Sequence, residues 1–270
     1  MLDVRPVSPT IGAEVHGIDL AVALDDSTKD EIEKAWLDHK VLFFRDQDIT
    51  TEQHIAFCRR FGDLEVHPFV PQKPGYQEVF LLTHDEQHRG TENFWHSDVT
   101  WRLEPSLGSM LRAVELPDVG GDTLFADMEA AYDALDAELQ ARLLTMTAVH
   151  DFTRVFAHDK HADEIAELRM QFPPAEHPVV RTHPVTGRRS LYVNVAFTSH
   201  IVGLEPTESK ALLRRLYRQA SVPEFQCRFR WQRNSFALWD NRCAQHYAVS
   251  DYWPARRVME RVTIVGDRPR

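Results

Sequence analysis

The chain has 270 residues, 43% of them hydrophobic, and is long enough to bury a full-sized core. Its 31 basic and 41 acidic residues give a formal net charge of −10. Because nucleic acids and anionic membranes are usually bound by a surplus of Lys and Arg, we expect neither as a partner. No apolar run approaches the roughly 20 residues of a membrane span, and no signal peptide is recognisable. Three cysteines without CxxC spacing favour reduced thiols, so we expect a cytoplasmic protein.

Four segments combine a candidate capping residue, apolar residues at helical spacing and a stop signal. The expected helices run from a cap at Ser27 to His39, from a capping box at Thr50 and Gln53 to Gly62, from Asp127 toward Leu144, and from Thr207 to before Pro223.

Short segments rich in β-branched and aromatic residues predict strands. They are Val41–Phe44, Glu78–Leu82, Gly108–Leu116, Val179–Thr182, Leu191–Val195 and Phe225–Trp231, with a hairpin turn over His183–Ser190. Regular helices do not separate these strands, so a doubly wound parallel sheet is disfavoured. We expect one domain over residues 1–270, mainly β, with a closed or two-layered antiparallel core and helices packed outside.

The segment FWHSDVTW places His96 and Asp98 one residue apart among apolar neighbours. On an extended strand these two side chains point the same way and reach one ion. A buried carboxylate needs a partner, so Asp98 either binds a metal or accepts a hydrogen bond from His96. The same H-x-D spacing recurs at His161 and Asp163, but there a dense charged stretch predicts a solvated face.

His246 lies on a short predicted strand near the C-terminus. With His96 and Asp98 it would form a set of two imidazoles and one carboxylate, which suits non-haem Fe(II) and leaves positions open. A structural zinc site normally uses four protein ligands, often sulfur. An ordinary core histidine is the alternative for His246.

The segment RRVMERVTIV alternates two faces of a strand. If its odd-numbered face looks inward, Arg257 and Arg261 enter the β core roughly 13 Å apart, at about 3.3 Å per residue. A buried guanidinium keeps its charge and requires an anion, and Glu260 faces the other way. A dicarboxylate at one arginine and an acidic substrate at the other would satisfy both. A surface strand with solvated arginines is the alternative.

Seven segments in this order resemble the taurine dioxygenase family of Fe(II)/2-oxoglutarate-dependent oxygenases. They are IGAEVHGIDL, VLFFRDQDIT, WHSDVTW, GGDTLFADM, HPVVRTHPVTG, WDNRCAQHYAVSDY and RRVMERVTIVGD. The resemblance implies a double-stranded β-helix, or jelly-roll, core with flanking helices. It also implies Fe(II), 2-oxoglutarate and O₂ as cofactor and co-substrates.

The resemblance further implies a role for each matching residue. His96, Asp98 and His246 would be the iron ligands, and Thr123 and Arg257 would hold 2-oxoglutarate. The substrate pocket would be formed by His67, Glu92, Val99, Phe152 and Arg261, with His67 and Arg261 on the anionic group, and with Trp239 stacked near the metal. The implied reaction hydroxylates taurine or a related alkylsulfonate beside sulfur, releasing sulfite and an aldehyde together with succinate and CO₂.

Two positions depart from the taurine-using pattern: Val70 replaces a tyrosine, and Glu92 replaces an asparagine. Glu92 would either attract a substrate ammonium or reject taurine. An alkyl sulfate or an aryloxyalkanoate is the alternative substrate, and a non-catalytic β-barrel that binds small acids is the alternative function. Residues 84–93 are read as an ordinary surface loop or as a lid, and a homo-oligomer, dimer or tetramer, is left open.

Overall fold

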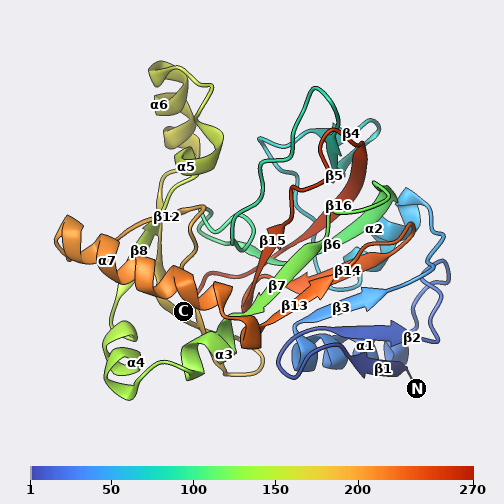
Figure 1. The fold of residues 1–270 in the computed structure, drawn as a ribbon, viewed down its shortest axis with the longest axis horizontal. Helices are drawn as coiled ribbons and strands as arrows, with labels where there is room; N and C mark the ends of the chain where they lie inside the picture. Colours follow the sequence, from blue (N-terminus) through green and yellow to red (C-terminus); the bar gives the residue numbers. More distant parts are fainter. Residues whose placement is uncertain (1) are drawn as a thin grey trace.

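The computed structural model describes residues 2–270, and a large sheet runs through its centre (Figure 1). Its eight strands are antiparallel to their neighbours except for the parallel pair β2 and β3. In spatial order they are β1 (Asp3–Pro6), β2 (Ala13–His16), β3 (Val41–Phe44), β14 (Phe236–Asp240), β6 (Ser106–Glu115), β16 (Arg257–Val265), β5 (Tyr76–His84) and β4 (Gln72–Lys73).

A smaller antiparallel sheet, β13–β7–β15, faces the large one. It consists of β13 (Gln226–Phe229), β7 (Thr123–Asp127) and β15 (Ala244–Ala248). Side chains from both sheets form one core cluster, in which the rings of Phe43 and Phe229 stack with centroids 4.0 Å apart. Burying such paired apolar faces is what drives two sheets together. The expected two-layered β core is confirmed.

Helices α1 (Asp26–His39) and α2 (Thr51–Arg59) cover the outer face of the large sheet, where Trp36 and Phe57 join its core cluster. The capping box of Thr50 and Gln53 is confirmed. The expected cap at Ser27 is wrong. Asp25 caps α1 instead, because its carboxylate accepts the Thr28 N–H at 2.7 Å.

The expected third helix is two helices, α3 (Met128–Asp133) and α4 (Ala137–Leu143). Asp136 ends the connection by accepting the Leu139 N–H at 2.8 Å, which caps α4. The fourth helix, α7 (Pro206–Tyr217), begins with proline rather than a Thr207 cap, and continues as short 3₁₀ turns at Arg218–Ser221 and Pro223–Phe225.

Five short strands form two further small sheets. They are β8 (Thr147–His150), β9 (Ala175–Pro178) and β12 (Thr198–Ile201) in one sheet, and the hairpin β10 (Val180–Thr182) with β11 (Arg189–Leu191) in another. The hairpin is confirmed, but the strand expected over Leu191–Val195 is mostly wrong. Asn194 turns the chain there, since its side chain accepts the Phe197 N–H at 2.9 Å.

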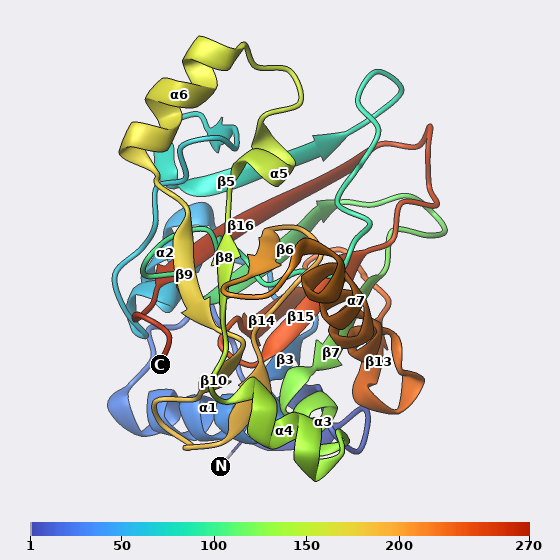
Figure 2. The ribbon, with the colours of Figure 1, turned by 90° about the vertical axis from the view of Figure 1, so that its left-hand side faces the viewer.

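Two helices were not expected: α5 (Thr153–Phe156) and α6 (Ala162–Gln171). Both views place α6 at the edge of the molecule; Figure 1 shows it set apart from the two sheets, and in Figure 2 it overlaps the end of the large sheet near β5. His161 and Asp163 lie exposed at its start, as the charged surroundings indicated. Across residues 2–270, none of the helices is both long and apolar enough to cross a membrane.

Adjacent leucines at the end of α4, the last helical residue Leu143 and the C-cap Leu144, give a matched test of the packing. Leu143 is fully buried in the core cluster of α3, α4 and α7, whereas Leu144 is 41% exposed. We expect Leu143→Ala to lower the free energy of unfolding by about 2–5 kcal/mol, because it leaves a cavity. Leu144→Ala should cost less than about 1 kcal/mol. Urea denaturation of both variants measures this, and equal losses would contradict the packing.

Candidate active site

A pair of backbone hydrogen bonds joins His96 to His246. The His96 N–H donates to the His246 carbonyl at 3.0 Å, and the His246 N–H donates to the His96 carbonyl at 2.8 Å. Both side chains therefore leave the chain side by side, with ring centroids 4.1 Å apart. The expected strand around His96 is reduced to this single bridge, because Asp98 already lies in a turn. The three side chains converge nonetheless.

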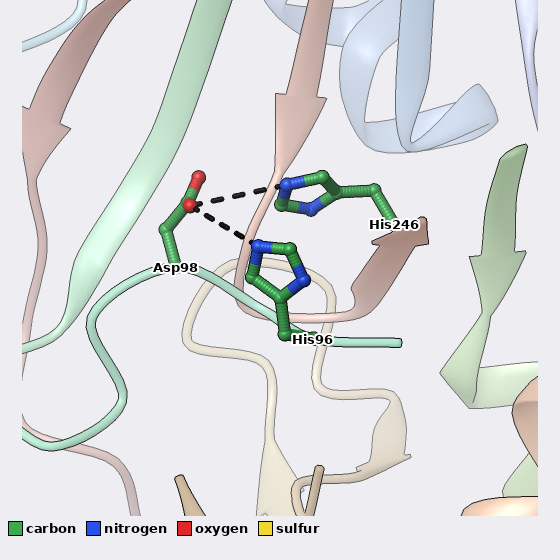
Figure 3. A group of neighbouring side chains, drawn as sticks. All are labelled: His96, Asp98 and His246. Atoms are coloured by element: carbon green, nitrogen blue, oxygen red, sulfur yellow. Dashed lines mark ion pairs between the residues drawn. The ribbon is translucent and has the colours of Figure 1, made fainter. Parts of the chain in front are cut away.

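Asp98 completes the group (Figure 3). Its Oδ1 lies 4.0 Å from Nε2 of His96 and 3.9 Å from Nε2 of His246. The Nδ1 of His96 donates to the Phe94 carbonyl at 2.9 Å, which leaves the Nε2 lone pair facing Asp98. Burial lowers the pKa of both histidines, so they are neutral, as metal ligands must be. Two imidazoles and one carboxylate at this spacing fit a ferrous ion.

Polar side chains in and directly after strands of the large sheet hold Asp98 in place. Its Oδ2 accepts Ser109 Oγ at 2.9 Å and Asn241 Nδ2 at 3.3 Å, and its N–H donates to Asn241 Oδ1 at 3.0 Å. Arg261 Nη1 lies 2.7 Å from Oδ1. Burial raises the pKa of Asp98, but Arg261 and the two histidines lower it by more, so it lies well below its usual range. The carboxylate is ionised and ready for a cation.

Asn241 and Ser109 were missed by sequence reasoning. Asn241 follows the buried Trp239–Asp240 pair in the WDNR motif, but its sequence position does not reveal that its amide reaches Asp98. Trp239 also contacts this network: its ring centroid lies 4.8 Å from that of His246, and its Nε1 donates to Asn241 at 3.0 Å.

A second group of close ligand-type atoms involves His183, Asp240 and Cys243. Its hydrogen bonds are already satisfied. Arg242 donates to both oxygens of Asp240, at 2.8 and 2.6 Å. His183 Nδ1 accepts the Val185 N–H, so its proton lies on Nε2 and points to Asp240 at 3.0 Å. This group is a structural hydrogen-bond network rather than a metal centre.

A cavity of about 270 Å³ opens beside the His96–Asp98–His246 group. Apolar side chains line much of its wall, among them Val70, Leu82, Phe94, Val155, Phe156 and Phe197. Thr123, Arg257, Arg261, His67, Glu92 and Val99 also line it. Nine of the ten predicted site residues, including His96, Asp98 and His246, therefore line this one cavity.

The tenth predicted residue, Phe152, lies behind the wall. It stacks on Phe69 with centroids 5.2 Å apart and packs against Trp101, while Phe156 takes the place at the cavity. Val99 reaches the cavity from a left-handed conformation with φ 46°, which is strained for a β-branched residue. Backbone strain of this kind is typical of functional sites.

Arg257 is a buried guanidinium that forms no ion pair with a carboxylate of residues 2–270. It is 3% exposed, and its Nε and Nη2 have no hydrogen-bond partner among residues 2–270. The inward orientation of the odd-numbered face is confirmed, since Met259 lies between the sheets and Glu260 meets Lys73 at 2.5 Å on the other face. Thr123 Oγ1 accepts Trp231 Nε1 at 2.9 Å, so its own hydroxyl hydrogen stays available. A bound carboxylate would satisfy these orphaned donors.

Arg261 and His67 form a second group of donors. The His67 Nδ1 accepts the N–H groups of Phe69 and Val70, at 3.1 and 3.2 Å, so Nε2 carries the proton. Burial lowers the pKa of His67 to about 3, which keeps the ring neutral. The Arg261 guanidinium lies 5.1 Å from the Phe80 ring centroid, with its Nε unpaired. Together they fit an anion close to the His96–Asp98–His246 group.

Comparison with known proteins identifies this arrangement. The family model described as "Taurine catabolism dioxygenase TauD, TfdA family" matches residues 3–263. The chain is 38% identical to the alkylsulfatase of Acinetobacter baylyi, over 98% of this chain and 86% of that protein. It is 37% identical to the (S)-phenoxypropionate/alpha-ketoglutarate-dioxygenase of Sphingobium herbicidovorans, over 98% of this chain and 95% of that protein. A taurine dioxygenase structure from Burkholderia xenovorans superposes with a TM-score of 0.86 and 40% identity, over 99% and 90% of the two chains.

The site and these similarities define a 2-oxoglutarate-dependent dioxygenase with Fe(II) and O₂ as its further requirements, built on a jelly-roll core. The chain belongs to the TauD/TfdA family.

Removing Asp98 tests the metal group. Asp98→Ala takes away the one anionic ligand, so we expect it to abolish stoichiometric binding of Mn(II), used as a stand-in for Fe(II). Asp163→Ala, in the exposed second H-x-D, should bind Mn(II) like the unmodified chain. Electron paramagnetic resonance of free Mn(II) measures both. Retained binding in Asp98→Ala would remove this residue from the metal site.

Proposed function

We propose that this enzyme oxidises a small organic anion with an apolar chain, an alkyl sulfate or alkylsulfonate, at the carbon next to the acidic group. The observation that carries the proposal is the set of groups that border one cavity. His96, Asp98 and His246 border it together with Arg261 and His67. Arg261 Nη1 lies 2.7 Å from Asp98 Oδ1, and the His67 ring lies 5.5 Å from that of Phe156 in the apolar wall. An anion held by those donors would leave its first carbon facing the metal and its chain against Val155, Phe156 and Phe197.

The two arginines support separate tasks. Arg257 is four residues from Arg261 on the same face of β16, so the two side chains reach the cavity from different positions along the strand. Arg257 with Thr123 would hold the distal carboxylate of 2-oxoglutarate, and Arg261 with the His67 N–H would hold the substrate anion. A planar guanidinium matches carboxylate, sulfate and sulfonate oxygens with paired hydrogen bonds.

The metal centre would be held by His96, Asp98 and His246. Once bound, Fe(II) supplies O₂ activation coupled to the decarboxylation of 2-oxoglutarate to succinate and CO₂. The chain's own contribution is positioning: Arg261 and His67 orient the C–H bond, and the aromatic wall keeps water from the reacting carbon. Hydroxylation of a carbon that bears a sulfate ester gives an unstable product that breaks down to an aldehyde and sulfate. The same step beside a sulfonate gives an aldehyde and sulfite.

Taurine is a second candidate, favoured by Glu92. This carboxylate lines the cavity, is 40% exposed, and could pair with the ammonium of taurine. Two observations favour the apolar chain instead: Glu92 already faces His84 Nε2 at 3.4 Å, and Val70 adds an apolar side chain to the wall. Among the similar proteins, the alkylsulfatase of Acinetobacter baylyi fits the sulfate ester, and the phenoxypropionate enzyme shows that an aryloxyalkanoate belongs in any test.

A substrate panel tests the proposal. Hexyl sulfate, hexanesulfonate, phenoxypropionate and taurine are supplied with Fe(II), 2-oxoglutarate and O₂, while succinate, sulfate and sulfite are measured. We expect kcat/KM for the best hexyl compound to exceed that for taurine by at least about tenfold, because its chain buries apolar surface that taurine lacks. Preferred turnover of taurine would contradict the proposed chain specificity, and no substrate-dependent succinate with any acid would contradict the function.

Two arginine variants test the division of tasks, each serving as the control for the other. Arg257→Gln should raise the KM for 2-oxoglutarate by about 10- to 100-fold and change the KM for the anionic substrate little, because a charged pair is lost only at the co-substrate. Arg261→Gln should do the reverse. Steady-state kinetics with each reactant varied measures both constants. Equal loss of both affinities in both variants would refute separate roles.

A further inference from the structure

Tyr252 and His84 connect Arg257 to the mouth of the cavity. The guanidinium carbon of Arg257 lies 5.6 Å from the ring centroid of Tyr252. The Tyr252 hydroxyl lies 2.7 Å from Nδ1 of His84, and Nε2 of His84 lies 3.4 Å from a carboxylate oxygen of Glu92. A carboxylate only accepts, so the proton of a neutral His84 ring lies on Nε2, and the Tyr252 hydroxyl then donates to Nδ1.

The ends of two strands bring these groups together. Arg257 is the first residue of β16, His84 is the last residue of β5, and the two are directly paired in the antiparallel register. The loop after β5 and the loop before β16 run side by side at one edge of the molecule (Figure 2). Ser250 Oγ links them by donating to the Gly90 carbonyl at 2.7 Å.

Two glycines let Tyr252 fit closely between these loops. A Cβ at Gly90 would lie 2.9 Å from the Tyr252 hydroxyl, and a Cβ at Gly121 would lie 3.2 Å from its ring. The Gly121 N–H is itself fixed by Asp251 at 2.8 Å. The Tyr252 ring therefore has neighbours on both sides, and its position is coupled to the loop that contains Gly90.

We propose that Tyr252 is a positioning residue for 2-oxoglutarate, and that its hydrogen bond to His84 couples co-substrate binding to the loop of residues 85–93. The proposal rests on the proposed role of Arg257. No carboxylate among residues 2–270 forms an ion pair with Arg257, so the Tyr252 ring is the surface against which its guanidinium is set. The hydroxyl–His84 bond keeps that ring in place.

Coupling of this kind is reciprocal. If 2-oxoglutarate fixes Arg257 against Tyr252, and Tyr252 fixes His84, then a ligand that stabilises the contact also orders the loop that begins one residue later. The factor by which 2-oxoglutarate favours the ordered loop equals the factor by which the ordered loop tightens 2-oxoglutarate binding, and breaking the hydrogen bond removes both effects. Arg89 is exposed in that loop, so trypsin cleavage after Arg89 reports on the loop without any turnover.

The experiment compares Tyr252→Phe, His84→Ala, the double variant and a control, Tyr217→Phe. Tyr217 donates its hydroxyl to the Thr198 carbonyl at 3.1 Å, and neither residue lines the cavity. Binding of 2-oxoglutarate is followed anaerobically with Fe(II) by its charge-transfer absorption. We expect Tyr252→Phe to weaken binding by about three- to tenfold, the loss typical of one buried hydrogen bond, with kcat within about twofold of the unmodified chain. The double variant should be no weaker than His84→Ala alone.

Limited proteolysis gives the second readout. In the unmodified chain and in Tyr217→Phe, 2-oxoglutarate should slow cleavage after Arg89 by at least about threefold. In Tyr252→Phe it should have no such effect. Additive losses in the double variant, or a Tyr252→Phe chain that matches the control in both readouts, would overturn the coupling. An unmodified chain without the absorption band would instead overturn the proposed 2-oxoglutarate site itself.

Discussion

The two hydrogen bonds between the backbones of His96 and His246 are the constraint on which the site depends. They join residues 150 positions apart in the sequence, and they are made at the edge of the small sheet, where β15 has a free side for the segment that leads to β6. A bridge of this kind fixes two Cα atoms at a few ångströms and sends both side chains to one face. The edge of the small sheet therefore places the two histidines together, and the turn that follows His96 brings Asp98 to them.

Charge balance explains the rest of the cavity. Asp98, Arg257 and Arg261 are largely removed from water, and each would be costly without a partner. Asp98 is balanced by Arg261 on one oxygen and held by Ser109 and Asn241 on the other. Among residues 2–270 no carboxylate forms an ion pair with Arg257, its guanidinium lies against the Tyr252 ring, and its Nε and Nη2 are unpaired. A buried guanidinium with unpaired donors is stabilised when an anion binds to it. An acidic co-substrate would be such an anion.

Much of the architecture was readable from the sequence because it depends on local rules. The alternation in β13, the capping box at Thr50 and the paired faces of β16 follow directly from residue types and spacing. Errors arose where a distant or competing contact decided the outcome. Asp25 displaced Ser27 as a cap, and the side chain of Asn194 ended the strand expected at Leu191–Val195. Helix α6 has no buried residue, so the pattern of its apolar residues carried little signal.

The site divides in the same way. The ligand-type residues stood out because histidine and aspartate in an apolar segment demand a partner, and the resemblance joined His246 to them. Ser109 and Asn241 hold Asp98, and Phe156 rather than Phe152 lines the cavity wall. Both outcomes depend on side-chain directions, which cannot be predicted from one sequence. Phe152 and Phe156 stand at the two ends of the single turn of α5. Phe156 lines the cavity, whereas Phe152 packs behind the cavity wall.

The central claim is that His96, Asp98 and His246 bind one ferrous ion. Anaerobic titration of the chain with Fe(II) in excess 2-oxoglutarate tests it most directly, by following the charge-transfer absorption. The account predicts saturation at one iron per chain, and no saturable absorption in His246→Ala despite an unchanged circular dichroism spectrum. A His246→Ala chain that binds iron and develops the same band with the same stoichiometry would contradict it.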